Sequence, residues 1–352
     1  MLLSYWDAGY VKLDVTDPVH PTYLADSDFT FPDPELKQQT GRLETPEGNG
    51  HEAEFTHDGQ HIIAADEDFN PTRVNLRSDD GTTGRAVQAG AAQLPTDGSL
   101  TAKAIHVGVA CDPATVPAPP ATGGPYLAAV ERGVCTFTQK AATVEAVTAN
   151  GGYAGTVVFN RTGAGGCGAL VSPAVVATKP FFFINRPTGL GLFDADAGYN
   201  EAACLALPAD GSVGRGPVPI GTVGDTITLT AAFDGWGYVH LFANNNGKLR
   251  ELDTFGVPEA MDPAHATGFG ALSVHEVATS HCNPHLAYLS YYDAGLRVIE
   301  IQHNKLVEVG RFIDEGGNDF WGVQVFSRDG VEYVAASDRD FGVYIFRFTG
   351  HD

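Results

Sequence analysis

The feature that most constrains this chain is an internal repeat shared by its two ends. The residues LSYWDAG at 3–9 recur as LSYYDAG at 289–295, and a stretch that alternates apolar and polar residues follows each copy. A second pair of similar segments, 51–69 and 321–342, contains a strand pattern, an Asp-Gly turn, another strand pattern and an Asp-x-Asp-Phe corner. A weaker copy begins at Trp236. A unit that recurs in this way must pack against its own copies to bury a core.

These units predict antiparallel sheets arranged as a β-propeller. Short strands separated by Asp-Gly turns form meanders, and 42 Gly and 21 Pro favour many turns over a helical bundle. A single meander cannot bury both of its faces, so copies stack, and stacking around a central axis gives a propeller. We expect a mainly β fold with about five blades, some incomplete, in which C-terminal strands complete an N-terminal blade.

The segment from Tyr5 to Pro21, YWDAGYVKLDVTDPVHP, resembles the LVIVD repeat of secreted bacterial β-propellers. The resemblance covers about 1–80 and 225–350. It implies the propeller fold without implying one function, because propellers include lactonases, phosphotriesterases, lyases and binding scaffolds.

A different domain interrupts the repeats. We place this insert at 82–222, which leaves propeller segments at 1–81 and 223–352. The insert is rich in Ala, Gly and Pro, and its motif RGVCTF at 132–137 resembles the core of the protease-associated (PA) domain. The resemblance implies an α+β domain that acts as a lid or docking module and has no catalytic residues of its own.

Within the insert, the residue pattern predicts one helix and two buried strands. Ala141, Val144 and Val147 share one stripe of a helix at about 138–149, which Gly151 and Gly152 end. The apolar runs at 156–160 and 180–185 predict the strands.

Four of the five cysteines lie in the insert, and the fifth, Cys282, lies in the propeller part. Clustered cysteines in an acidic, secreted chain suggest two disulfides. The PA resemblance implies the pairs Cys111–Cys135 and Cys167–Cys204, because the cysteine after Arg-Gly in such domains often pairs with one upstream. Zinc is the alternative, but the sequence has no Cys-x-x-Cys spacing.

The propeller geometry predicts one face that gathers histidines and acidic side chains. In a blade, the loop before the innermost strand and the turn between its second and third strands open on the same face. His51 and His275 occupy matching positions in two blades, and each precedes a Glu. We expect both near a divalent metal, as ligands or as a general base. The other predicted ligands are Asp66, Asp293, Asp338 and Asn318, and the predicted binding residues are Trp321, Glu276 and Asp7.

Two interpretations of these residues remain open. Oxygen ligands suit Ca²⁺ first, whereas added imidazoles suit Zn²⁺ or Mn²⁺, and such a metal would polarise a carbonyl or phosphoryl oxygen and activate water. In the alternative, each turn Asp bonds its own backbone, the tryptophans fill blade cores and the histidines have a structural role.

Composition and charge narrow the partners. The formal net charge is −22, which disfavours nucleic acid and anionic membrane surfaces, although an acidic surface also serves solubility alone. No run of 18 apolar residues predicts membrane insertion, and no phosphate-binding or dinucleotide motif predicts a nucleotide cofactor. We expect an extracellular or periplasmic protein, with its signal peptide either removed or upstream of this reading frame.

Two functions follow as hypotheses. The first is a divalent-metal-dependent hydrolase of esters, lactones or phosphotriesters that uses the axial face of the propeller. The second is a non-catalytic extracellular scaffold that binds protein or glycan.

Overall fold

The computed structural model describes residues 1–6, 9–27, 47–209, 218–245 and 249–350. The chain forms two compact, mainly β units: Met1–Pro71 with Phe233–Asp352, and Thr72–Ala232. The second unit extends beyond the expected limits of 82 and 222 at both ends. Its outer residues form β6 (Thr72–Ser78) and most of β12 (Val223–Phe233), and both strands belong to its own sheet.

The first unit contains four antiparallel sheets in the described residues, with strand orders β1-β2-β3, β14-β13-β5-β4, β15-β16-β17-β18 and β19-β20-β21. The strands of the first two sheets are β1 (Leu2–Ser4), β2 (Tyr10–Asp14), β3 (Thr22–Asp26), β4 (Gly50–Phe55), β5 (His61–Asp66), β13 (Val239–Ala243) and β14 (Arg250–Phe255). Those of the last two are β15 (Glu276–Thr279), β16 (Leu286–Ser290), β17 (Leu296–Gln302), β18 (Lys305–Phe312), β19 (Phe320–Arg328), β20 (Val331–Asp338) and β21 (Gly342–Phe346).

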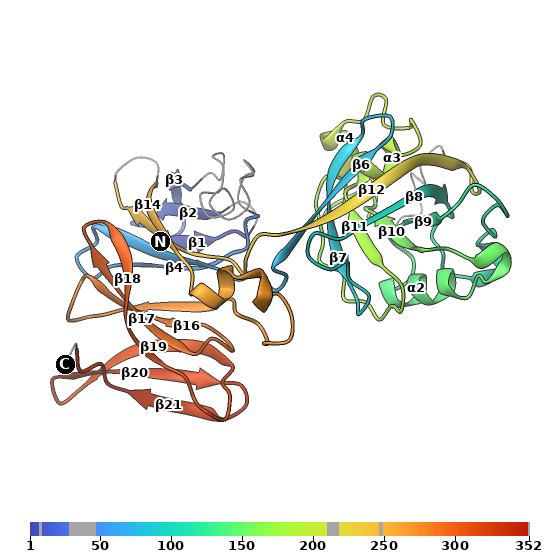
Figure 1. Cartoon of the computed structure of the whole chain (residues 1–352). Coiled ribbons are helices and arrows are strands. Elements are labelled where there is room, and N and C mark those ends of the chain that lie inside the picture. The colour runs from blue at the N-terminus through green and yellow to red at the C-terminus, as the bar shows by residue number, and fades with distance from the viewer. Residues whose placement is uncertain (7–8, 28–46, 210–217, 246–248, 351–352) are drawn as a thin grey trace. The chain divides into compact units, whose positions relative to one another are not determined.

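The edge strands β1, β4, β15 and β19 connect the four sheets. β1 contacts β4, β4 contacts β15, and β15 contacts β19 (Figure 1). The sequence repeat builds two matching links: Trp6 in the first copy forms a β-bridge to Gly50, and Tyr292 in the second forms one to Phe320. Both bridging residues have positive φ, 51° and 38°. The repeated motif therefore turns the chain so that one sheet pairs with the next.

The weaker repeat copy from Trp236 does not form a sheet of its own. Its strands β13 and β14 join β4 and β5, with Leu241 opposite Ile63. The second unit is thus inserted between β5 and β13, two neighbouring strands of one sheet. Because this copy completes an existing sheet, the described residues of the first unit form four sheets where about five units were expected.

Apolar side chains and glutamates hold adjacent sheets together. Ile63 from β5 and Val277 from β15 share one buried core. Glu52 Oε2 accepts the Val277 N–H at 2.8 Å, and Glu54 Oε2 accepts the Thr279 N–H at 2.7 Å. Two backbone N–H groups at the edge of β15 are thereby bonded by side chains of the neighbouring sheet.

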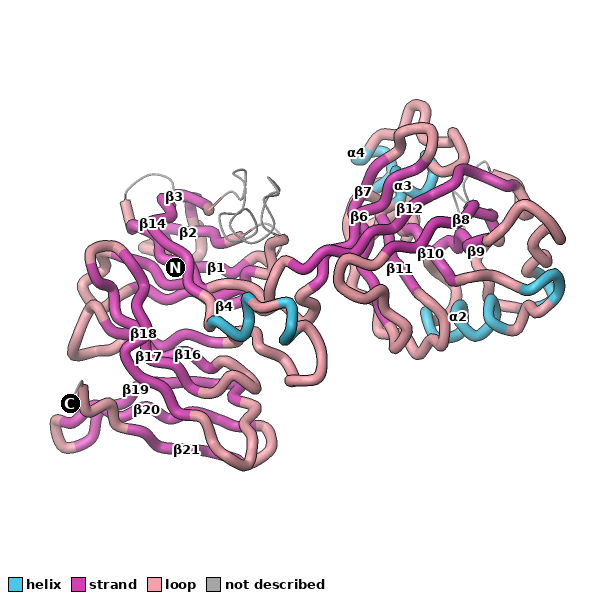
Figure 2. Tube along the Cα trace, viewed as in Figure 1, coloured by secondary structure: helices cyan, strands magenta, loops and turns pink. Residues whose placement is uncertain are grey.

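The second unit is a closed seven-stranded barrel with the order β10-β11-β7-β6-β12-β8-β9. Besides β6 and β12 its strands are β7 (Thr83–Ala89), β8 (Ser99–His106), β9 (Tyr126–Glu131), β10 (Gly155–Phe159) and β11 (Phe181–Ile184). The strands from β8 through β9 and β10 to β11 pair in parallel. Figure 2 shows the strands of this barrel with short helices outside them. The predicted strands at 156–160 and 180–185 correspond to β10 and β11.

Short helices complete the part of the chain that the structure describes. They are α2 (Phe137–Glu145), α3 (Arg186–Gly191) and α4 (Glu201–Leu205), with 3-10 turns η1 (Pro113–Thr115), η2 (Ala149–Gly151), η3 (Pro258–Met261) and η4 (Pro263–His265). The side chain of Thr136 caps α2 by accepting the Gln139 N–H at 3.2 Å. The helix was expected to reach 149 but ends at Glu145, and the 3-10 turn η2 follows it, with φ values of 55° at Asn150 and 86° at Gly151.

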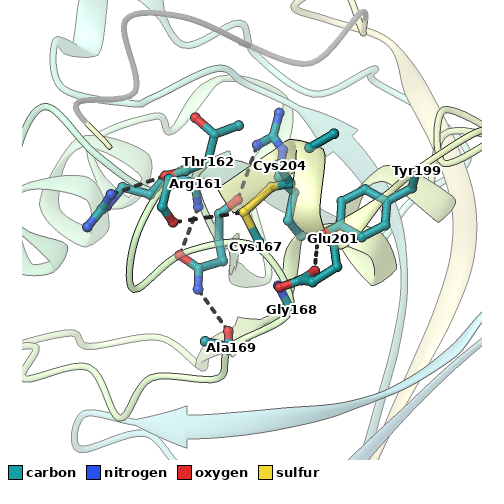
Figure 3. The surroundings of a disulfide bond; sticks show 12 residues. Arg161, Thr162, Cys167, Gly168, Ala169, Tyr199, Glu201 and Cys204 are labelled. Atoms are coloured by element: carbon teal, nitrogen blue, oxygen red, sulfur yellow. Dashed lines mark hydrogen bonds between the residues drawn. A yellow bond between two sulfur atoms is a disulfide. The ribbon is translucent and has the colours of Figure 1, made fainter. Parts of the chain in front are cut away.

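Both predicted disulfides are confirmed. Cys111 pairs with Cys135 and Cys167 with Cys204, at Cα–Cα separations of 5.8 and 6.0 Å. Figure 3 shows the second bridge, where Glu201 on α4 accepts the Gly168 N–H at 3.0 Å beside Cys167. Cys282 is a free, exposed thiol.

Candidate functional site

His51 and His275 lie together with Glu67 in the first unit. His51 is on β4, Glu67 directly follows β5, and His275 directly precedes β15. β4 pairs with β5 and contacts β15, so three segments that are distant in sequence meet at one end of these strands. The site therefore lies where the sheet that contains β4 and β5 packs against the sheet that contains β15.

The three side chains, called the metal group below, lie close enough together that they could hold one metal ion. His51 Nε2 lies 3.4 Å from Glu67 Oε2, and His275 Nε2 lies 3.5 Å from Glu67 Oε1. One ligand atom from each residue lies within 4.8 Å of the others. In a tetrahedral zinc site with bonds of about 2.0–2.1 Å, neighbouring ligand atoms are about 3.3 Å apart. The observed spacing fits such an ion without large movement.

Hydrogen bonds orient two of these side chains. His51 Nδ1 lies 3.0 Å from the carbonyl oxygen of His275, which can only accept, so Nδ1 is protonated and Nε2 faces Glu67. Tyr292 donates its hydroxyl proton to Glu67 Oε1. Metal-binding histidines and carboxylates commonly have outer hydrogen bonds of this kind. An imidazole nitrogen that faces a carboxylate oxygen requires a cation between them, either a proton or a metal.

Burial sets the electrostatics of the group. The side chains of Glu67 and His275 are 7% and 5% exposed, whereas that of His51 is 28% exposed and leaves access from solvent. Burial lowers the pKa of His275, against the opposing effect of the Glu67 carboxylate, and favours the neutral imidazole that a metal requires. Burial also raises the pKa of Glu52, beside His51, to about 7, although the Val277 amide works against this rise.

Asp66, a predicted metal ligand, has other partners. Its Oδ1 accepts the Tyr10 hydroxyl at 2.7 Å, and its Oδ2 lies 2.5 Å from His240 Nε2. His240 Nδ1 lies 2.6 Å from Glu251 Oε1. Burial opposes charge on His240, but Asp66 and Glu251 outweigh it and raise the pKa of His240 to about 10. Asp66 thus anchors a buried ion pair next to Glu67 instead of joining the metal group.

The remaining predicted oxygen ligands serve turns. Asp293 Oδ2 accepts the Ala271 N–H at 2.8 Å. Asn318 Oδ1 accepts the Asp314 N–H at 2.7 Å, and its amide nitrogen donates to the Asp293 carbonyl. Asp338 accepts the N–H groups of Asp340 and Phe341 at 2.9 Å. These bonds fit the alternative, in which such side chains satisfy backbone donors, and metal ligation by these three residues stays a prediction.

The three predicted binding residues lie in different places. Trp321 lies beside the metal group, with its ring 4.8 Å from that of His275. Glu276 accepts the Val323 N–H at 3.0 Å and thus links β15 to β19. Asp7 lies outside the described residues.

Glu67 was missed by the sequence interpretation, although a signal was present. It is the middle residue of the Asp66-Glu67-Asp68 corner, and the second repeat copy has Arg339 at that place. A middle residue that differs between the two copies is not explained by the corner structure that the copies share. The two Asp positions agree between copies and the middle position does not.

A second acidic group, Glu47, Asp68 and Asp234, also brings three ligand atoms within 4.8 Å of one another. It offers oxygen atoms alone. Acidic groups of this kind are common in proteins without a bound ion, so we assign no role to it.

No family model and no curated protein matches the chain. Among solved structures it is similar to BSAP, a zinc aminopeptidase from Bacillus subtilis, with a TM-score of 0.30 and 17% identity over 52% of this chain and 36% of that one. It is also similar to Apa1, a psychrophilic subtilisin-like protease from the Antarctic psychrotroph Pseudoalteromonas sp. AS-11, with a TM-score of 0.26 and 13% identity over 55% of this chain and 38% of that one. This chain spans little more than a third of either protein, and these scores assign neither fold nor activity. None of the helices in the described residues has the length and apolar character needed to cross a membrane.

Proposed function

We propose that this protein is an extracellular, divalent-metal-dependent hydrolase of esters, lactones or phosphotriesters, with its metal held by His51, Glu67 and His275. The single observation behind this proposal is that group: two imidazoles and one carboxylate from three separate segments, each at a distance that suits coordination. Two histidines and one glutamate are also the protein ligands of several zinc hydrolases.

The donor set favours Zn²⁺ or Mn²⁺ over Ca²⁺, which was expected first. Calcium takes six to eight oxygen ligands, whereas this group supplies two nitrogens and one carboxylate. Three protein ligands leave room for water and substrate, as in catalytic zinc sites. When bound, the ion would lower the pKa of its water and polarise a carbonyl or phosphoryl oxygen.

The chain's own residues would prepare this chemistry. The His275 carbonyl fixes the ring of His51 through Nδ1, and the Tyr292 hydroxyl fixes one oxygen of Glu67. The other Glu67 oxygen faces His51 Nε2. Fixed ligands hold an ion in one geometry and leave its open positions to water and substrate.

We further propose that the first unit is a β-propeller of the LVIVD type and the second a PA-like domain. The linked edge strands β1, β4, β15 and β19 support the first assignment. The helix α2 and the parallel strands β10 and β11, which follow the Arg-Gly-x-Cys motif, support the second. The two disulfides fit an oxidising, extracellular location.

The test is hydrolysis of a small panel, an aryl ester, a lactone and a phosphotriester, by protein stripped with EDTA and then reloaded with zinc or manganese. We expect turnover to vanish on stripping and to return with metal. Glu67→Gln and His275→Ala should each lower kcat/KM at least a hundredfold, since each removes a ligand. His20→Ala, at an exposed histidine that does not belong to the metal group, serves as the matched control.

Turnover that survives both chelation and the two ligand substitutions would overturn the proposal. Metal bound at the site without turnover of any ester, lactone or phosphotriester would instead support the second candidate, a non-catalytic scaffold that binds protein or glycan.

A further inference from the structure

Two indoles flank the metal group, one beside each histidine. The ring centroid of Trp6 lies 6.0 Å from that of His51 at 77°, and the centroid of Trp321 lies 4.8 Å from that of His275 at 35°. The two tryptophans are 42% and 49% exposed, whereas the third, Trp236, is 6% exposed and packs in the core. Trp6 and Trp321 therefore expose large apolar surface beside the candidate metal.

Backbone contacts hold both indoles in place without burying them. The N–H of Trp6 donates to the Gly50 carbonyl at 3.1 Å, and the Gly50 N–H donates back to the Trp6 carbonyl at 3.2 Å. The carbonyl of Trp321 accepts the Ser290 hydroxyl at 2.8 Å. These contacts fix the start of each side chain beside its histidine, so a ligand that stacks there meets an ordered surface and loses less free energy to ordering.

Electrostatics favours an uncharged ligand beside the two indoles. Burial and, to a smaller extent, the Arg339 guanidinium lower the pKa of His275. This guanidinium lies 3.5 Å from Asp319, whose carboxylate neutralises its charge. The net charge of −22 disfavours an anionic ligand, and the divalent ion that the proposed function requires would repel a cationic one. An uncharged ring with an apolar face is what exposed indoles bind by stacking.

We propose that Trp6 and Trp321 form a platform for the ring of the substrate, an uncharged six-membered ring with an apolar face, either aryl or pyranose. The ester then lies at the metal group. The ester part of this inference rests on the proposed hydrolytic function, whereas ring binding requires no turnover.

Saturation-transfer NMR with phenol and with methyl glucopyranoside tests ring binding directly and separates the aryl from the sugar source. We expect saturable binding of one of the two by zinc-loaded protein. Trp6→Ala and Trp321→Ala should each raise Kd about three- to tenfold, in line with aromatic contacts. Trp321→Phe should restore most of the affinity, and Tyr23→Ala, at an exposed aromatic on β3, should leave it unchanged.

The second measurement compares KM values. A phenyl ester, or an acetylated pyranoside in its place, is compared with the ethyl ester of the same acid. The platform predicts a lower KM for the ring-bearing ester and loss of that preference in the double Trp variant. Ring affinity that is unchanged in the double variant, or no ring binding at all, would overturn it. Ring binding without hydrolysis of any ester would defeat the proposed function and leave the platform standing.

Discussion

Asp66 and His240 form a buried ion pair that supports the corner before Glu67. Asp66 also accepts the Tyr10 hydroxyl, and His240 also contacts Glu251. A buried carboxylate that loses its charged partner is strongly destabilising. We expect His240→Gln to lower the free energy of unfolding by about 3 kcal/mol, measured by urea denaturation.

His285→Gln, at an exposed histidine in a turn, is the matched control and should change stability little. Equal stability of the two variants would show that the His240 pair does not hold this corner.

At the scale of single residues, the sequence predicted the two histidines and missed their third partner. His51 and His275 were chosen because they occupy matching positions in two predicted blades, and their rings do lie together, with centroids 4.3 Å apart. For turn carboxylates such as Asp338 the sequence does not separate two roles, because an Asp that bonds its own backbone and an Asp that binds a metal have the same local pattern. Only the positions of side chains from strands distant in sequence distinguish these two roles.

At the scale of elements, α2 of the second unit contains a buried lysine. Lys140 is 0% exposed, and its Nζ donates to the Val109 carbonyl at 2.5 Å. Burial lowers the pKa of Lys140 to about 8. The unfolded chain, with the ordinary pKa of about 10.4, then binds more protons between these values, so this lysine makes the protein more stable as pH rises from 8 to 10.4.

Lys140→Met removes that dependence. Relative to Lys140→Met, we expect the free energy of unfolding of the wild type to rise by about 3 kcal/mol from pH 7.5 to pH 10.5. Urea denaturation at the two pH values measures it, and Lys103→Met, at an exposed lysine on β8, is the control. A difference that does not change with pH would mean that Lys140 keeps an ordinary pKa.

The positions of the strands were predicted better than their pairing within sheets. The meander pattern and the insert followed from local sequence, and β10 and β11 lie where apolar runs predicted them. The copy from Trp236 was assigned to a separate unit, because its sheet partner β5 lies on the other side of the insert. Pairing between strands so distant in sequence leaves no local signal.

At the scale of the whole molecule, the insertion point makes the second unit dispensable for the site. The unit leaves the first one after Pro71 and returns at Phe233, between the paired strands β5 and β13. All members of the metal group and both flanking indoles belong to the first unit. We expect a variant with a short Gly-Ser linker in place of Thr72–Ala232 to fold and to bind zinc with wild-type affinity, measured by circular dichroism and calorimetric titration.

A deletion variant that folds but does not bind zinc would show that the second unit contributes to the site.

The central claim is that His51, Glu67 and His275 hold one divalent ion. Anomalous diffraction at the zinc edge, from crystals of the full chain grown with zinc, tests it most directly. We predict a single strong peak about 2.0–2.2 Å from His51 Nε2, His275 Nε2 and a Glu67 oxygen. Zinc density only elsewhere, for example at Glu47, Asp68 and Asp234, with the imidazoles in direct contact with Glu67, would contradict the account.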